Sequence, residues 1–145
     1  DGAGGVFVGG YTEGALGGPN AGGGDAWLAR YDGAGNRIWI RQFGSSAHDY
    51  TQAVAPDGSG GVYQTGITRG SLGGPNVGYW DAWLTRHDGA GNPLWILQLG
   101  TSGDDQARFV APDGAGGVYV GGFTDGSLGG QNAGGVDACI ETLRR

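Results

Sequence analysis

Three aspartates stand at equivalent places in three similar segments, and they are the first candidates for a binding site. Each follows a glycine-rich stretch with an asparagine five residues earlier; the aspartates are Asp25, Asp81 and Asp137, and the asparagines are Asn20, Asn76 and Asn132. Their oxygens can hydrogen-bond the hydroxyl groups of a sugar. They can also cap the backbone amides of their own loop, as Asp and Asn do in turns.

Calcium is a second chemistry that these side chains could support. Asp49 and Asp105 form a further repeated pair, so each copy offers one or two carboxylates near a loop. Because Ca²⁺ takes about six to eight oxygen ligands, one or two carboxylates are too few for a calcium site on which folding depends. We expect the carboxylates to cap loop amides and expect no metal or other cofactor; one Ca²⁺ per copy is the alternative.

Tyr79 and Trp80 add an aromatic pair to the second of the three loops only. Exposed aromatic side chains can stack on a sugar or anchor a protein partner. A tryptophan in a glycine-rich loop can equally fold back onto its sheet. The candidate ligand-binding set therefore consists of this pair together with the repeated aspartates and asparagines.

The residue types that catalysis uses most often are not arranged as a catalytic site. His48 and His87 occupy different positions of the repeat, and no Gly-x-Ser-x-Gly motif occurs. Cys139 replaces Trp27 and Trp83, so we expect a small buried apolar side chain rather than a reactive thiol. We predict no catalytic residue and no enzymatic activity.

The candidates recur because the chain is built from a 56-residue repeat. The copies span residues 1–56, 57–112 and 113–145, the last of them truncated, and together they form one repeat domain. A fixed period of this kind indicates a solenoid, a propeller or another repeat array.

Short runs rich in Val, Ile, Tyr and Trp, bounded by Gly, Asp and Asn, predict strands and no helix. Four strands are expected per complete copy, at residues 107–111 (52–55 in the preceding copy), 62–65, 81–86 and 94–99. Asp-Gly turns join the first strand to the second and the third to the fourth. Four short antiparallel strands per repeat describe a β-propeller blade, and Trp39 and Trp95 are expected to be buried between blades.

The composition excludes several classes of protein. Glycine supplies 36 of 145 residues but does not recur at every third position, so the chain is not collagen-like. The formal net charge of −6 argues against nucleic-acid binding, which requires basic patches. No run of about 18 apolar residues occurs, so no membrane-spanning segment is predicted. The single cysteine, Cys139, excludes an intrachain disulfide.

The combined motifs resemble the bacterial beta-propeller repeat family often labelled SBBP. The resemblance rests on Asp57-x-x-Gly-Gly-Val-Tyr, Asp81-Ala-Trp-Leu, Arg86-x-Asp88-x-x-Gly91-Asn92-x-x-Trp95 and Gln98-x-Gly100. It implies an all-β fold of propeller blades and an extracellular or cell-surface location in a bacterium. It carries over no catalytic residue.

The blades are incomplete in a single chain, because the copies supply three, four and three strands in turn. We expect either the remainder of a longer propeller or a homo-oligomer to complete them. The leading functional expectation is a non-enzymatic structural or interaction scaffold in a secreted or surface protein. The alternative is a carbohydrate-binding, lectin-like propeller with one shallow site per blade, its partner a glycan; an enzyme with a central polar site is the third class.

Overall fold

The computed structural model describes residues 1–143, which form ten β-strands in three antiparallel sheets. None of these residues lies in a helix, so no described helix could cross a membrane. The first sheet has the order β1-β2-β3, the second β4-β5-β6-β7 and the third β10-β9-β8. The strands are β1 (Val6–Thr12), β2 (Asp25–Tyr31), β3 (Arg37–Phe43), β4 (Asp49–Pro56), β5 (Val62–Thr68), β6 (Asp81–His87), β7 (Pro93–Leu99), β8 (Asp105–Pro112), β9 (Val118–Thr124) and β10 (Asp137–Leu143).

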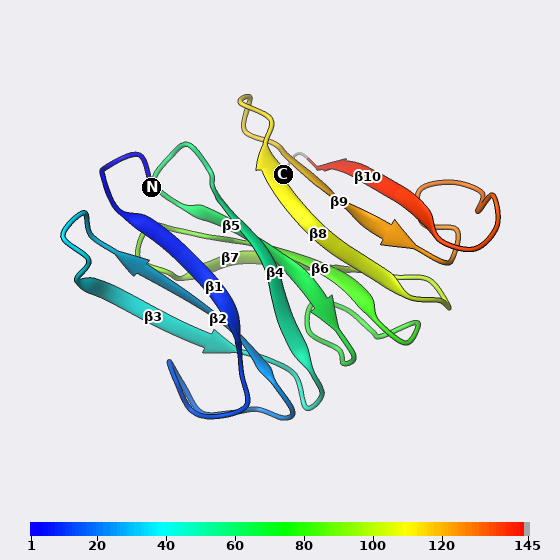
Figure 1. Cartoon of the computed structure of the whole chain (residues 1–145), viewed down its shortest axis with the longest axis horizontal. Helices are drawn as coiled ribbons and strands as arrows, with labels where there is room; N and C mark the ends of the chain where they lie inside the picture. The colour runs from blue at the N-terminus through cyan, green and yellow to red at the C-terminus, as the bar shows by residue number, and fades with distance from the viewer. Residues whose placement is uncertain (144–145) are drawn as a thin grey trace.

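The three sheets follow one another in chain order, with the complete four-stranded sheet in the middle (Figure 1). This confirms the prediction of an all-β fold of propeller blades, incomplete in a single chain. Among the described residues, the first blade has no counterpart of β4, and the third has no counterpart of β7. We refer to the sheets as the first, second and third blade.

The strands are longer than predicted because glycine and polar positions also pair. β5 continues through Gly66 to Thr68, and its pairing register with β4 shifts at a bulge between Thr51 and Ala53. A side chain at Gly66 would collide with the Tyr50 carbonyl oxygen. Glycine is therefore required at this position by the close approach of two strands.

The hairpin turns form as their Asp-Gly sequences predict. At residues 57–61, the Asp57 carboxylate accepts hydrogen bonds from the amides of Ser59 and Gly61, both at 2.8 Å. Gly58 and Gly60 adopt φ values of +79° and +94°, which favour glycine. Burial opposes ionisation of Asp57, but its hydrogen bonds to Ser59, Arg86 and Gly61 outweigh burial and lower its pKa below 3.8.

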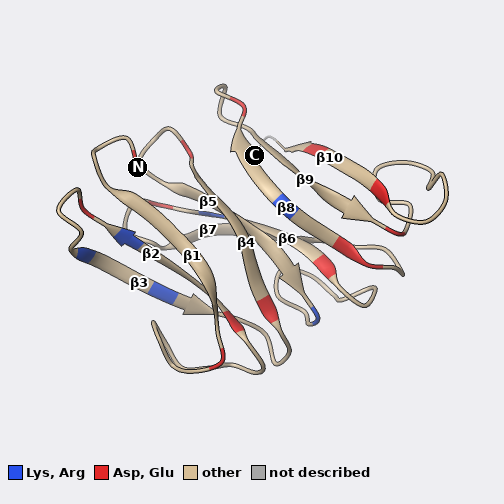
Figure 2. Cartoon of the chain, viewed as in Figure 1, with Lys and Arg blue, Asp and Glu red and all other residues tan. Residues whose placement is uncertain are grey.

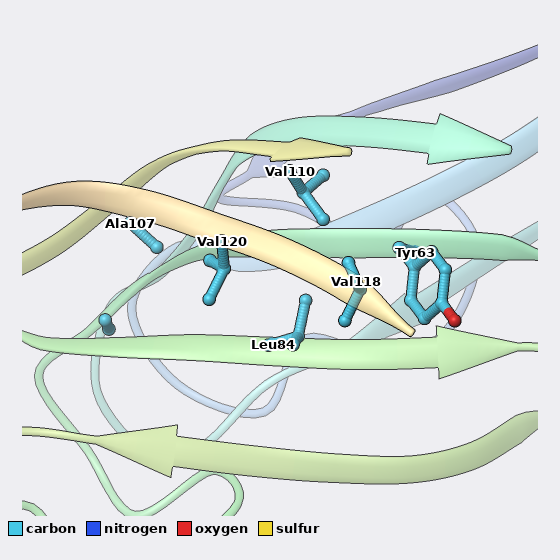
Figure 3. Packing of buried hydrophobic residues seen from close by; sticks show 7 residues of the cluster. Tyr63, Leu84, Ala107, Val110, Val118 and Val120 are labelled. Atoms are coloured by element: carbon cyan, nitrogen blue, oxygen red, sulfur yellow. The ribbon is translucent and has the colours of Figure 1, made fainter. Parts of the chain in front are cut away.

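Apolar side chains fill the spaces between neighbouring blades. Between the second and third blades they form one buried cluster, shown in Figure 3, which comprises Tyr63, Ala82, Leu84, Ala107, Val110, Val118 and Val120. Between the first and second blades they form another, which comprises Phe7, Leu28, Trp39 and Val62. Burial of apolar area between the blades stabilises their stacking.

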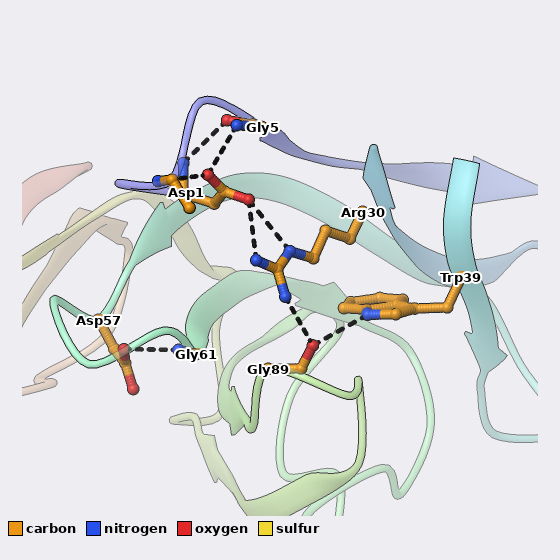
Figure 4. Close-up of polar contacts among 8 residues, drawn as sticks. Asp1, Gly5, Arg30, Trp39, Asp57, Gly61 and Gly89 are labelled. Carbon is orange, nitrogen blue, oxygen red and sulfur yellow. Dashed lines mark hydrogen bonds and ion pairs between the residues drawn. The ribbon is translucent and has the colours of Figure 1, made fainter. Parts of the chain in front are cut away.

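Polar contacts also join the first blade to the second (Figure 4). The Arg30 guanidinium forms an ion pair with Asp1 (3.0 Å) and donates a hydrogen bond to the Gly89 carbonyl of the second blade (3.1 Å). The Trp39 indole N–H donates to the same carbonyl at 3.0 Å. The turn that contains Gly89 thus covers the outer strand of the preceding blade.

Trp39 and Trp95, both expected to be buried between blades, differ in how far they are buried. Trp39 is 9% exposed, because it lies against Gly89 and Gly91 of the next blade. Trp95 is only partly buried. The described residues include no equivalent of turn 88–92 in the third copy.

Candidate functional site

The repeated aspartates begin the equivalent strands β2, β6 and β10 of the three blades, and their carboxylates close the glycine-rich loop that precedes each strand. Asp81 is fully buried at the start of β6. Its Oδ2 atom accepts hydrogen bonds from the Val77 amide (3.0 Å) and the Gln98 side chain (2.8 Å). Its Oδ1 atom accepts one from the Gly78 amide (3.2 Å). Both carboxylate oxygens of Asp81 are therefore used inside its own loop.

The other two aspartates repeat this arrangement in part. Asp25, also fully buried, accepts hydrogen bonds from the Ala21 amide (2.8 Å) and the Gln42 side chain (3.0 Å). Asp137 is partly exposed and accepts one from the Ala133 amide (2.6 Å). The aspartates that begin strands lie along one side of the three sheets (Figure 2).

Two glutamines outside the candidate ligand-binding set organise the same loops; Gln98 had been noted only as part of a family motif, and Gln42 not at all. Gln98 accepts hydrogen bonds from the amides of Leu72 (2.9 Å) and Gly73 (3.1 Å) through Oε1. Its Nε2 donates to the Gly70 carbonyl (2.9 Å) and to Asp81. Gln42 makes the same set of bonds in the first blade; its partners are Leu16, Gly17, Gly14 and Asp25. The signal that could have found them is that glutamine stands at the same repeat position in the first and second copies, on β3 and β7.

The asparagines make local bonds in their turns. Asn20 donates to the Gly23 carbonyl and accepts from the Gly22 amide, both at 3.0 Å. Asn132 makes equivalent bonds within its own loop. The side-chain nitrogen of Asn76 is buried and makes no hydrogen bond within the described residues.

A hollow of about 370 Å³ brings Asn132 and Asp137 together on the third blade. Leu128, Cys139 and Glu141 also line it. In the second blade, β7 and Gln98 occupy the equivalent space, since Gly73 and Gly74 pack against that strand. The hollow therefore lies where a fourth strand would pair with β10.

Asp49 and Asp105 begin the strands β4 and β8, and each bonds the neighbouring strand and the preceding loop. Asp49 is fully buried, accepts a hydrogen bond from the Thr68 hydroxyl (2.5 Å), and accepts two from Ser45 (2.5 and 2.9 Å). Asp105 does the same with Thr124 and Thr101. Within residues 1–143, no group of three or more His, Cys, Asp or Glu side chains is placed to hold a metal ion.

The structure joins Tyr79 and Trp80 to aromatic residues from two other strands. The ring centroids of Trp80 and Tyr50 lie 5.5 Å apart, and those of Tyr50 and Tyr11 lie 4.3 Å apart. Tyr79 meets Trp80 edge-on at 6.2 Å. We call Tyr11, Tyr50, Tyr79 and Trp80 the aromatic cluster. It spans the first and second blades, and Tyr11 and Tyr79 are 55% and 59% exposed.

Arg69 and His48 support the aromatic cluster. The Arg69 guanidinium lies 3.9 Å from the ring centroid of Tyr79 and 4.5 Å from that of Trp80, and it donates to the Tyr79 hydroxyl. His48 Nδ1 accepts a hydrogen bond from the Gly24 amide and lies 3.0 Å from the Tyr50 hydroxyl. Burial raises the pKa of Tyr50, with smaller contributions from Tyr11 and Glu13.

His87 lines a cavity of about 390 Å³ between the first and second blades. The cavity walls include Phe43, Leu72 and Ile96, and Arg41 lies at the same cavity. His87 is 2% exposed, and neither ring nitrogen makes a hydrogen bond of normal geometry within the described residues. Burial lowers the pKa of His87 below 6.5, and the backbone of Gly91 opposes this in part.

The expectation that Cys139 is a buried apolar side chain is wrong, because Cys139 is partly exposed. The burial of the equivalent residues also depends on the blade: Trp83 is fully buried in the middle blade, whereas Trp27 in the first blade is partly buried. The remaining burial raises the pKa of the Cys139 thiol above 9.0. A raised pKa disfavours the reactive thiolate at neutral pH.

Two comparisons relate the chain to known proteins. Residues 94–129, which run from β7 through β8 and β9, match the family described as Beta-propeller repeat, labelled SBBP. The chain is also 33% identical over 138 residues to the regulatory protein FlaEY of Caulobacter vibrioides. That alignment covers 86% of this chain and 14% of the relative, so the chain spans a small part of that protein's length.

Proposed function

We propose that the chain is a scaffold of propeller blades without catalytic activity or bound cofactor, on the ground that residues 94–129 match the SBBP beta-propeller repeat family. In this proposal the chain either has a structural role or presents a surface to which another molecule binds. The proposal places the chain outside the cell or on the cell surface of a bacterium. Surface proteolysis of intact cells tests that location.

The exposure of equivalent positions in different blades carries the scaffold proposal. Val62 and Leu84 are fully buried in the middle blade, where they face the first and the third blade respectively. Their counterparts at the two ends, Val6 and Ile140, are 50% and 68% exposed. The end blades therefore present the same apolar faces that the middle blade buries.

Further blades of the same kind could pack against these apolar faces and bury them. They come from the rest of a longer propeller or from a second copy of the chain. We propose that the 145-residue chain by itself uses the second route and self-associates. Native mass spectrometry at micromolar concentration is expected to show assemblies larger than 14.6 kDa. A folded species of 14.6 kDa alone would refute self-association.

Glycan binding is the second candidate function, and the aromatic cluster is the observation that favours it. Two of its four rings are more than half exposed on the loop side of the blades. Exposed tyrosine and tryptophan rings offer an apolar face together with a polar edge, which suits the mixed surface of a sugar. Binding of the chain to immobilised oligosaccharides tests this function.

A further inference from the structure

We infer that the aromatic cluster is a single binding site for a neutral pyranose sugar at the junction of the first and second blades. This inference rests on the glycan-binding candidate and sharpens it. It replaces one shallow site per blade by one site in the chain.

The cluster occupies positions at which the three copies differ. Residues that hold the loops are the same or similar between copies, as Gln42 and Gln98 or Asp25 and Asp81 show. Cluster residues and their supports have dissimilar counterparts: Gln106 for Tyr50, Gly23 and Gly135 for Tyr79, Gly24 and Val136 for Trp80, Glu13 and Asp125 for Arg69, and Asp104 for His48. Only Tyr11 has apolar counterparts of comparable size, Ile67 and Phe123.

The blade fold therefore does not require these aromatic side chains. The first and third loops form with glycine or valine where the second has Tyr79 and Trp80. A function performed by the second loop alone accounts for the difference, whereas a packing role would be needed in every blade.

Backbone hydrogen bonds hold the segments that carry the cluster. The Arg69 amide donates to the His48 carbonyl (2.9 Å), and the Asp105 amide donates to the Trp80 carbonyl (2.7 Å). A Cβ atom at Gly24 would lie 2.7 Å from the Tyr50 ring, so the absence of a side chain there leaves room for the ring. The backbone that carries the rings is thus held in place without a ligand, which reduces the entropy cost of binding.

The chemistry of the cluster suits a neutral sugar. The C–H face of a pyranose can stack on the electron-rich face of an aromatic ring. The hydroxyls of Tyr11 and Tyr79 and the second ring nitrogen of His48 can hydrogen-bond sugar hydroxyls. Arg69 is already engaged with two rings, and the chain carries a net charge of −6, which disfavours an acidic glycan.

The surroundings of the cluster favour a small ligand over a protein partner. A stable protein interface uses about 20–30 residues on each side. The loops beside the cluster instead consist largely of glycine; Gly22, Gly23, Gly24, Gly70, Gly73, Gly74 and Gly78 supply no side chains for such an interface. A single sugar ring needs only a few aromatic and hydroxyl contacts.

An array of neutral and acidic oligosaccharides, probed with the full chain, tests the inference. The key variant carries Tyr79→Gly and Trp80→Val together, which are the residues of the third loop and are compatible with the fold there. Tyr119→Ala, which removes an exposed aromatic far along the chain on β9, is the matched control. Binding to neutral glycans is expected to fall about tenfold or more in the double variant and to persist in the control.

Several outcomes would overturn the inference. These are the absence of neutral-glycan binding by the unmodified chain, binding to acidic glycans only, and equal binding by the double variant. A cluster that docks a protein would leave the array blank and so gives the first of these outcomes. Native mass spectra of the same samples report self-association separately, so loss of the sugar site and failure of the scaffold proposal are distinguishable.

Discussion

Trp39 is one of the side chains through which β3, the outer strand of the first blade, contacts the second blade. It is 9% exposed, packs near Phe7 and bonds the Gly89 carbonyl. Trp39→Ala is therefore expected to lower the free energy of unfolding by about 3–5 kcal/mol. Trp95→Ala, the matched control at the equivalent position, is expected to cost less because Trp95 is only partly buried. Urea titrations compare the two, and equal losses would contradict this account.

His87 makes stability depend on pH in a defined direction. Burial keeps its pKa in the folded chain below the ordinary value of 6.5, so the unfolded chain binds the proton more readily. The free energy of unfolding should be unaffected by His87 above pH 6.5, should fall as the pH drops below this value, and should level off once folded His87 is itself protonated.

The matched variant for this prediction is His87→Leu, because Leu143 stands at the equivalent position of the third copy. Urea titrations between pH 7.5 and about 4.5 should show that the free energy of unfolding depends less on pH in the variant, since only the unmodified chain has an imidazole at position 87. Identical slopes in the two proteins would show that His87 does not titrate in this range.

At the scale of the elements, the glycine-rich loops of the first and second blades each depend on a glutamine from the outer strand, Gln42 on β3 and Gln98 on β7. Gln98 satisfies two amides, one carbonyl and the Asp81 carboxylate. Gln98→Ala is expected to destabilise the chain by about 1–3 kcal/mol, because it leaves buried polar groups without partners. Amide hydrogen exchange should accelerate at Leu72 and Gly73. Gln131→Ala, at an exposed glutamine, is the control and should leave exchange in loop 69–80 unchanged.

The elements themselves were predictable because their determinants are local. Runs such as Leu94-Trp95-Ile96 and turns such as Asp88-Gly-Ala-Gly-Asn92 specify strands and hairpins within a few residues. The bonds of Gln98 to residues 70–73 and the contact of Tyr11 with Tyr50 join segments far apart in the chain. No local pattern encodes such contacts, although comparison between the copies marks the positions involved.

Burial was predictable only where the covering blade is part of the chain. Trp39 and Trp95 lie in nearly the same local sequence, yet Trp39 is buried under turn 88–92 of the next blade, whereas Trp95 is partly buried and the described residues include no equivalent turn in the third copy. The same reason explains why Cys139 is partly exposed while Trp83 is fully buried. In a repeat fold, the environment of a residue depends on the neighbouring repeat as much as on its own.

At the scale of the whole molecule, the two exposed end faces are different surfaces. Val6 corresponds to Val62, which faces the preceding blade, and Ile140 corresponds to Leu84, which faces the following blade. Self-association that repeats the stacking within the chain must therefore join the Ile140 face of one copy to the Val6 face of the next. Such a head-to-tail contact generates a closed ring or an open filament.

This geometry predicts how two single variants behave apart and together. Val6→Lys places a charge on one end face and Ile140→Lys places a charge on the other, and each variant retains one intact face of the opposite kind. Because burying an unpaired charge is costly, each variant alone should remain monomeric. Mixed at equal concentration, the intact Ile140 face of the first should dock on the intact Val6 face of the second and stop at a one-to-one dimer. Native mass spectrometry distinguishes these species; dimers formed by either variant alone would show a symmetric contact and would refute head-to-tail stacking.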